Sequence, residues 1–165
     1  MASEPAALLH AVRRFLESAP LPPIAQAPFS GARTARCSHE TERVFEGDYE
    51  HIEIERCTRV LLRNVRARSL RVVESQLELS HVELVSDRVA LVITNSHLKW
   101  TGGAIWAPVC METTNSQLDV MGFACVASQE PFMVRSSSRI VASVSEVWRG
   151  RVKNPLHGVH PLQPD

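Results

Sequence analysis

The chain has 165 residues, of which 44% are hydrophobic, and its 18 Lys and Arg residues balance 18 Asp and Glu residues. This composition predicts one globular domain without the strong positive charge that is typical of nucleic-acid-binding and membrane-surface proteins. The sequence contains no run of about 18 apolar residues, the length that a membrane span needs. Its first residues also lack the profile of a signal peptide. We therefore expect a soluble protein, located in the cytoplasm if Met1 is its native start.

Residues 1–19 carry the pattern of an amphipathic helix between Ser3 and Ser18. Ser3 is a candidate N-cap, and Pro5 falls in the first turn, where proline is tolerated. Apolar residues recur at helical spacing on one face: Leu8, Leu9, Val12, Phe15 and Leu16. We expect this helix to cap the domain or cover one side of it, because its apolar stripe needs a partner.

Residues 20–48 are predicted to form a proline-rich extended arm and a loop. Proline fixes its own φ and disfavours helix in the residue before it. Four prolines therefore favour a polyproline-like arm: Pro20, Pro22, Pro23 and Pro28. The stretch from Ser30 to Gly47 is polar and mixed in charge, and its pattern predicts no regular element.

A repeat of about 20 residues fills the range 49–148. Each copy has a small polar pair, a polar residue, and then apolar, outward and apolar positions. One column of this pattern holds Ser or Thr in every copy: Thr58, Ser75, Ser96, Ser116 and Ser138. Further apolar runs precede and follow each copy, which gives three short strands per turn.

The repeat predicts an all-β solenoid, a parallel β-helix of about five rungs with three short strands per rung. We expect the right hand because strand crossovers are right-handed in about 98% of cases. Asn95 and Asn115 fit a corner, since Asn tolerates positive φ and stacked Asn or Ser side chains can hydrogen-bond along the axis. The alternative is a β-sandwich or barrel, but its hairpins favour Asn-Gly or Asp-Gly turns, which this sequence lacks.

The segments 94–100 (TNSHLKW) and 114–120 (TNSQLDV) resemble repeats of the pectate-lyase-like right-handed β-helix superfamily. The resemblance covers residues 49 to about 147 and implies the architecture rather than one activity. That superfamily includes lyases, hydrolases, epimerases, phage tailspikes and structural proteins. Its polysaccharide-processing members use longer coils than five turns, which would measure about 24 Å here.

One predicted outward column contains Glu78, Lys99 and Asp119 between two apolar residues, Leu61 and Val141. Neighbours in such a column lie about 4.8 Å apart. Two interpretations remain open for it. The alternating charges either form a ladder on a solvated face or make a carbohydrate site in which Glu78 and Asp119 are the acid and base.

A second predicted outward column begins with Glu53 and Arg71 and then becomes apolar at Val92, Cys110 and Met133. An apolar column should not face water. We expect the N-terminal helix or the proline-rich arm to cover it. A second protomer that docks on this interface is the alternative.

The first rungs are rich in arginine, and Arg63, Arg66 and Arg68 are candidates for an anion-binding patch. Glutamates lie among them, and no aromatic residues are interleaved to stack bases, so an ordinary charged surface is the favoured interpretation. The close pairs Cys37 with His39 and His157 with His160 do not supply the three or four ligands of a zinc site. We therefore predict no metal and no cofactor.

The four cysteines show neither a C-x-x-C pair nor the spacing of a disulfide framework: Cys37, Cys57, Cys110 and Cys125. We expect free thiols that act as small buried hydrophobes. The C-terminal tail, residues 149–165, is expected to close the end of the coil or to run back along one face.

These patterns favour a non-catalytic β-helix module with a structural, assembly or partner-binding role. A protein partner or self-association is favoured, and nucleic acid is disfavoured. The alternative is a carbohydrate-binding or carbohydrate-processing protein that uses an outward face of the coil. An enzyme is the less favoured interpretation, because the sequence contains no convergent catalytic motif.

Overall fold

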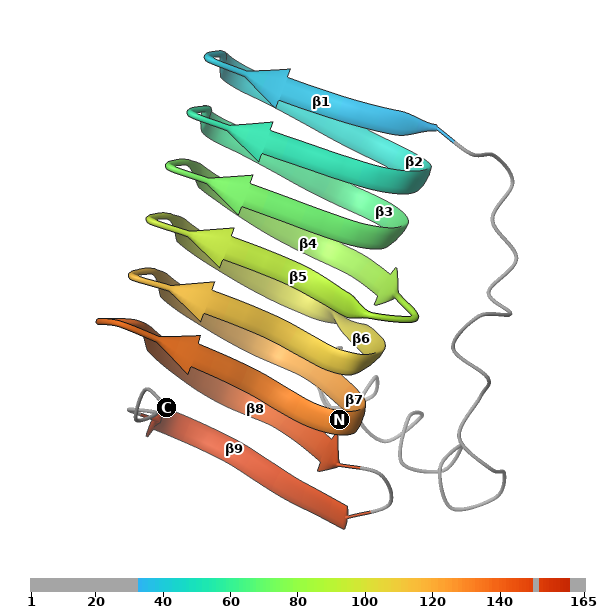
Figure 1. Ribbon diagram of the computed structural model, residues 1–165, viewed down its shortest axis with the longest axis vertical. Helices are drawn as coiled ribbons and strands as arrows, with labels where there is room; N and C mark the ends of the chain where they lie inside the picture. The colour runs from blue at the N-terminus through green and yellow to red at the C-terminus, as the bar shows by residue number, and fades with distance from the viewer. Residues whose placement is uncertain (1–32, 150–151, 161–165) are drawn as a thin grey trace, which may run out of the picture.

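The structure, a computed structural model, describes residues 33–149 and 152–160. Within these ranges the chain forms one sheet of nine strands, wound into a coil (Figure 1). The strands are β1 (Thr34–Ser38), β2 (Thr41–Glu55), β3 (Thr58–Val73), β4 (Gln76–Val85), β5 (Val89–Thr94), β6 (His97–Thr114), β7 (Gln117–Arg135), β8 (Arg139–Arg149) and β9 (Val152–His160). The predicted helix over residues 3–18 lies outside the described residues.

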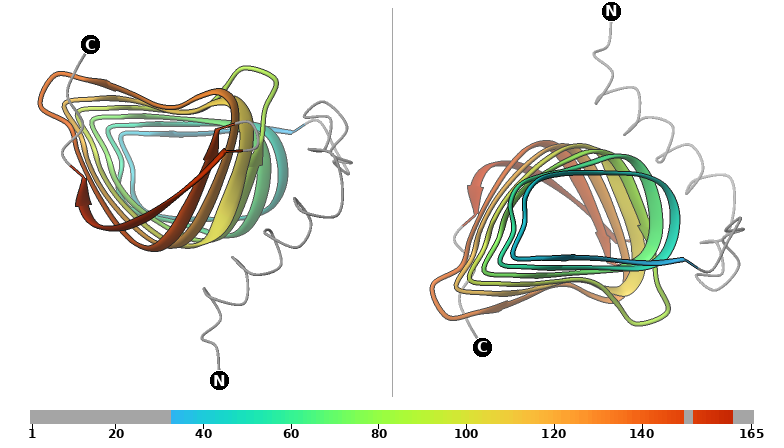
Figure 2. Two further views of the ribbon diagram at one scale, coloured as in Figure 1. Left: turned by 90° about the horizontal axis from the view of Figure 1, so that it is seen from below. Right: turned by 90° about the horizontal axis from the view of Figure 1, so that it is seen from above.

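All strand pairs from β1 to β8 are parallel, and each strand pairs with the equivalent strand one turn further on. The chain runs from right to left along the near side of Figure 1 and returns along the far side as it descends, so the coil is right-handed. Figure 2 shows the turns stacked on one another along the axis. The predicted parallel β-solenoid is confirmed, although the short strands of most rungs run together into one long strand.

The coil has about six turns, because six strand segments start after the same corner, at Thr41, Thr58, Gln76, His97, Gln117 and Arg139. The predicted boundary at residue 49 is therefore wrong for β1 and the first half of β2, which belong to the coil and not to a loop. The charges that obscured the pattern there point outward and pair between rungs. Arg59, for example, contacts Glu42 at 3.0 Å.

Inward side chains form continuous apolar columns, as the alternation predicts. One column, which starts next to the disulfide-bonded Cys37, holds Ile54, Val72, Ile93, Thr113 and Val134. The largest fully buried side chain, Trp100, packs edge-on against Phe123 at 5.1 Å and donates its indole N–H to the carbonyl of Gly102 at 2.8 Å. Gly103 is required beside it, since a Cβ there would lie 2.2 Å from the Val82 carbonyl oxygen.

A serine ladder runs along the corner before the strands β4, β6, β7 and β8. The backbone N–H of each serine donates to the hydroxyl of the next one, at 3.0 to 3.2 Å, in the order Ser75, Ser96, Ser116 and Ser138. The ladder begins at Cys57, whose N–H donates to Ser75 at 2.9 Å, and not at Thr58 as the repeat predicted. The shift arises because Arg59 (φ +55°) is an extra residue in this turn.

The residues that precede the serines confirm the predicted corner. Asn95 and Asn115 have φ values of +48° and +47°, and the Asn115 amide donates to Asn95 Oδ1 at 2.9 Å. In the last turn the residue with positive φ is Ser136 (φ +56°). The corner thus combines left-handed backbone with side-chain hydrogen bonds along the axis.

Different devices close the two ends of the coil. At the first rung, Phe45 and Tyr49 pack edge to face at 6.1 Å, and the guanidinium groups of Arg43 and Arg33 lie over these two rings at 4.9 and 4.6 Å. At the last rung, β9 pairs antiparallel with β8. The backbone of residues 152–160 therefore closes this end, as expected for the tail.

The expectation of free thiols is wrong, because two disulfides join Cys37 with Cys57 and Cys110 with Cys125. Their Cα atoms lie 6.5 and 6.6 Å apart. Parallel stacking brings residues about one turn apart into contact, so a pairing here does not require the close sequence spacing of small disulfide-rich domains. In the part of the chain that the structure describes, no helix could cross a membrane.

Candidate functional site

The predicted charged column forms as expected on the outward side of the strands that follow the serine corner. We call this surface the first face; it consists of residues 58–63, 76–80, 97–101, 117–121 and 139–143. Leu61, Glu78, Lys99, Asp119 and Val141 lie in register on consecutive rungs. The three charged side chains are all exposed, so the middle of the column is a charged stripe at the surface.

The predicted charge ladder, however, is not made of direct contacts. Among the described residues, no ion pair within 4.0 Å includes Glu78, Lys99 or Asp119. The attraction between exposed charges at this spacing is weak compared with their hydration. These charges therefore remain available to contact another molecule.

Two adjoining hollows of about 480 Å³ each lie on the first face and its corner, and they share Gln76 and His97. We call them together the first-face groove. One is lined by Arg59, Val60, Leu61, Gln76, Leu77, Glu78, His97 and Lys99. The other is lined by Thr58, Glu74, Ser75, Gln76, Asn95, Ser96, His97, Asn115 and Gln117. Asp119 does not line either hollow.

A second polar column contributes to this groove and was missed in the sequence. Gln76, His97, Gln117 and Arg139 lie in register two residues before the charged column. Alternation along each strand turns positions i and i+2 to the same side. The same pattern that identified Glu78, Lys99 and Asp119 therefore contained the signal for these residues.

The groove presents amide, imidazole, ammonium and carboxylate groups, which suit hydrogen bonding to a polar ligand. Its carboxylates do not suit glycoside hydrolysis. Glu78 and Asp119 are two rungs apart, which corresponds to about 10 Å, whereas paired glycosidase carboxyls lie about 5–9.5 Å apart. Lys99 also occupies the rung between them.

The arginine candidates are held in ion pairs with glutamates of neighbouring rungs. Arg63 pairs with Glu46, Arg66 with Glu83 at 3.5 Å, and Arg68 with Glu50 at 3.1 Å. Every arginine between residues 36 and 71 has a glutamate partner within 4.0 Å, and the partner of Arg43, Glu40, lies on the same rung. This arrangement favours the ordinary charged surface over an anion-binding patch.

The predicted apolar column is wrong at Cys110. That side chain is fully buried and bonded to Cys125, while Glu112 lies in register between Val92 and Met133. The prediction was two residues out of register, because Val109 and Met111 pair with Val89 and Leu91, so Cys110 between them corresponds to Ala90 and not to Val92. With Glu112 paired to Arg135 at 3.7 Å, this surface is mixed and half-buried rather than an apolar interface.

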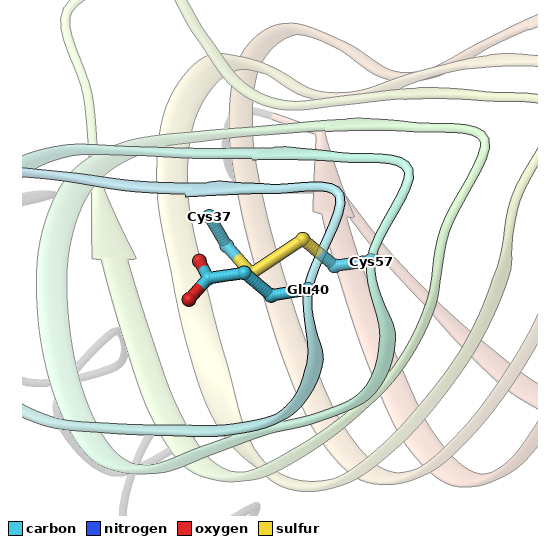
Figure 3. A group of neighbouring side chains, drawn as sticks. All are labelled: Cys37, Glu40 and Cys57. Carbon is cyan, nitrogen blue, oxygen red and sulfur yellow. A yellow bond between two sulfur atoms is a disulfide. The ribbon is translucent and has the colours of Figure 1, made fainter.

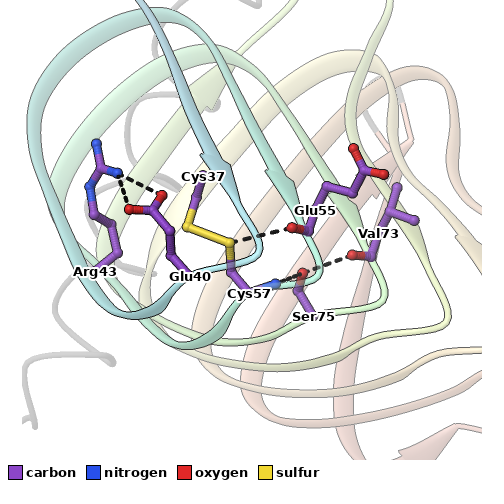
Figure 4. The surroundings of a disulfide bond; sticks show 7 residues. All are labelled: Cys37, Glu40, Arg43, Glu55, Cys57, Val73 and Ser75. Carbon is purple, nitrogen blue, oxygen red and sulfur yellow. Dashed lines mark hydrogen bonds and ion pairs between the residues drawn. A yellow bond between two sulfur atoms is a disulfide. The ribbon is translucent and has the colours of Figure 1, made fainter.

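One described cluster, Cys37, Glu40 and Cys57, brings potential metal ligand atoms within 4.8 Å of one another (Figure 3). The two sulfur atoms are bonded to each other. The Glu40 carboxylate binds Arg43 through both oxygens, at 2.8 and 3.1 Å (Figure 4). Because their donor atoms are engaged in this way, we assign the three side chains to fastening β1 and the first corner to the coil.

No family model, curated protein or solved structure matches this chain. The resemblance to the pectate-lyase-like superfamily therefore reaches as far as the parallel β-solenoid architecture.

Proposed function

We propose that this chain is a non-catalytic β-solenoid module that binds a protein partner through the first-face groove. The observation that carries the proposal is a contrast between two surfaces. Charged side chains of the first rungs are consumed in ion pairs, while Glu78 and Lys99 of the groove have no charged partner among the described residues.

The groove has the geometry of a docking surface for an extended segment. Its side chains repeat at the strand spacing of about 4.8 Å, and the buried columns beneath hold their backbone fixed. An extended peptide carries hydrogen-bonding groups along its length that can meet such a row. Fixed partners also reduce the entropy lost on binding.

The test compares capture of partners by three forms of the protein. In the first variant, Gln76→Ala, His97→Ala and Lys99→Ala are combined. In the control, Arg66→Ala, Arg68→Ala and Arg71→Ala change another surface. The proposal predicts a partner that the wild type and the control capture but the groove variant does not. Calorimetry with the purified partner then measures its affinity for each of the three forms. Equal affinity for all three forms contradicts it.

Carbohydrate binding is the second candidate, and the amide groups of the groove favour it. Gln76, Asn95, Asn115 and Gln117 all line one hollow, and amides can donate to and accept from sugar hydroxyls. The expected result is binding on a glycan array that is lost in the Gln76→Ala, Gln117→Ala double variant. Binding that survives this change would contradict the use of these amides.

The cytoplasmic location stays a prediction, and the two disulfides weigh against it. Disulfides persist in oxidising compartments and are rare in the reducing cytosol. Alkylation of the protein at the moment of cell lysis, followed by mass spectrometry, distinguishes the two locations. We expect Cys37, Cys57, Cys110 and Cys125 to be protected from the reagent.

A further inference from the structure

A second apolar cluster lies outside the core, on the outward side of the strands that follow the first face. Its side chains come from three consecutive rungs and are separate from the core cluster. We call it the outer apolar patch: Ala104, Trp106, Ala124, Val126 and Trp148. Two outward columns build it, because Ala104 pairs in register with Ala124, and Val126 lies between Trp106 and Trp148.

These side chains are buried although they point away from the core. Trp148 is 8% exposed, Val126 4% and Ala124 0%, and Glu146, in the column of Ala124, is 3% exposed. Neighbours in a column cover a side chain along the axis only. Within residues 33–149 and 152–160 every strand belongs to the coiled sheet itself, and none crosses this surface from outside (Figure 2). The patch therefore has no covering strand among the described residues.

We propose that the N-terminal segment, residues 3–18, docks as an amphipathic helix on the outer apolar patch. The segment has an apolar stripe that requires a partner: Leu8, Leu9, Val12, Phe15 and Leu16. An isolated helix of this length is only marginally stable in water. Docking on the coil would supply the packing that it lacks.

The described chain enters the coil directly above the patch. Arg33 donates to the carbonyl of Asp48 at 3.3 Å. Asp48 heads the outward column that continues in register through Arg66 and Glu83 to Ala104. The segment thus approaches from the polar end of the column whose apolar end is buried.

The lengths also agree. Ala104 and Glu146 lie three and five rungs below Asp48, which corresponds to about 14 and 24 Å. The residues from 19 to 32 can span up to about 46 Å when extended, so they reach the patch. The stripe from Leu8 to Leu16 would be about 12 Å long in a helix, close to the roughly 10 Å between the first and third rung of the patch.

Charge is complementary as well. The buried carboxylate Glu146 lies beside Ala124, and the segment carries Arg13 at the edge of its apolar stripe. A cation beside a buried carboxylate favours its charged form. A second copy of the chain would have to bury the same surface without this short connection, so the occupant favoured here is the chain's own segment.

The test uses the full chain and tryptophan fluorescence. Trp106 and Trp148 report on the patch, and the inward Trp100 is a constant reference. The Val12→Asp, Phe15→Asp variant places two charges in the stripe, while the control, Ala7→Asp with His10→Asp, places two on the opposite side of the helix. We expect a red-shifted emission and at least twofold stronger acrylamide quenching in the stripe variant only.

Two measurements on the wild-type chain keep the proposal falsifiable if the stripe variant does not fold. Backbone hydrogen exchange should be at least tenfold slower in residues 8–16 than in residues 20–30. Light scattering should show a monomer, and the tryptophan exposure measured by quenching should not change when the protein is diluted. Two results would overturn the proposal directly: hydrogen exchange in residues 8–16 as fast as in residues 20–30, or unchanged fluorescence in a folded stripe variant. Tryptophan exposure that rises on dilution would also overturn it, because it would assign the patch to a second copy.

Discussion

The serine ladder gives a stability prediction whose size follows from the hydrogen bonds of one residue. Ser116 Oγ accepts from the backbone N–H of Ser96 at 3.1 Å and donates to the carbonyl of Thr114 at 2.8 Å. In Ser116→Ala the Thr114 carbonyl keeps its bond from the Asn95 N–H at 2.9 Å. The buried N–H of Ser96 loses its acceptor, and an unsatisfied buried group costs about 1–3 kcal/mol. We therefore expect the free energy of unfolding to fall by about 2 kcal/mol.

Urea denaturation followed by far-UV circular dichroism measures this loss by linear extrapolation. Ser137→Ala is the matched control, because Ser137 is exposed and lies at the same corner outside the ladder; it should change stability by less than about 0.5 kcal/mol. Ser138→Ala should cost less than Ser116→Ala, because the Ser138 hydroxyl bond lies at the exposed end of the ladder. A Ser116→Ala variant as stable as the Ser137→Ala control would refute the reasoning.

Three further changes test the backbone and the core. Val144 has φ +49° and is 37% exposed, so Val144→Gly should raise the free energy of unfolding by about 1 kcal/mol in urea denaturation; a loss of stability would contradict the strain assigned there. Gly103→Ala should lower the melting temperature, because its Cβ would lie 2.9 Å from the Trp100 indole nitrogen as well as against Val82; an unchanged melting temperature would argue against this close approach. Leu98→Asp should abolish the cooperative melting transition, because an unpaired charge would be buried at a fully enclosed site; a soluble variant that melts cooperatively would contradict the inward position of Leu98.

The repeat predicted the fold and the charged column because both depend on local alternation. Glu78, Lys99 and Asp119 each lie between two inward apolar residues, and parallel stacking converts this regular spacing into one column. Pairing between remote residues leaves no such local trace. Cys110 and Cys125 are 15 residues apart, and only the path of the chain around the coil brings them together.

Local departures from the repeat account for most of the remaining errors. Arg59 shifts the start of the serine ladder. The column that was predicted to include Cys110 was misplaced because the polar residues Glu112 and Thr113 interrupt the apolar alternation before the corner. The first rung escaped notice because its outward charges outnumber its inward apolar residues in the sequence. The outer apolar patch was also missed, since Trp106 alternates with inward residues in an unbroken apolar run.

Backbone amide chemical shifts, measured while a captured and purified partner is added, test the use of the first-face groove most directly. The account predicts that the largest shifts and line broadening fall on Gln76, His97 and Lys99 and their neighbours across the groove. Shifts confined to the arginine-rich rungs or to the outer apolar patch, with the groove unchanged, would contradict it.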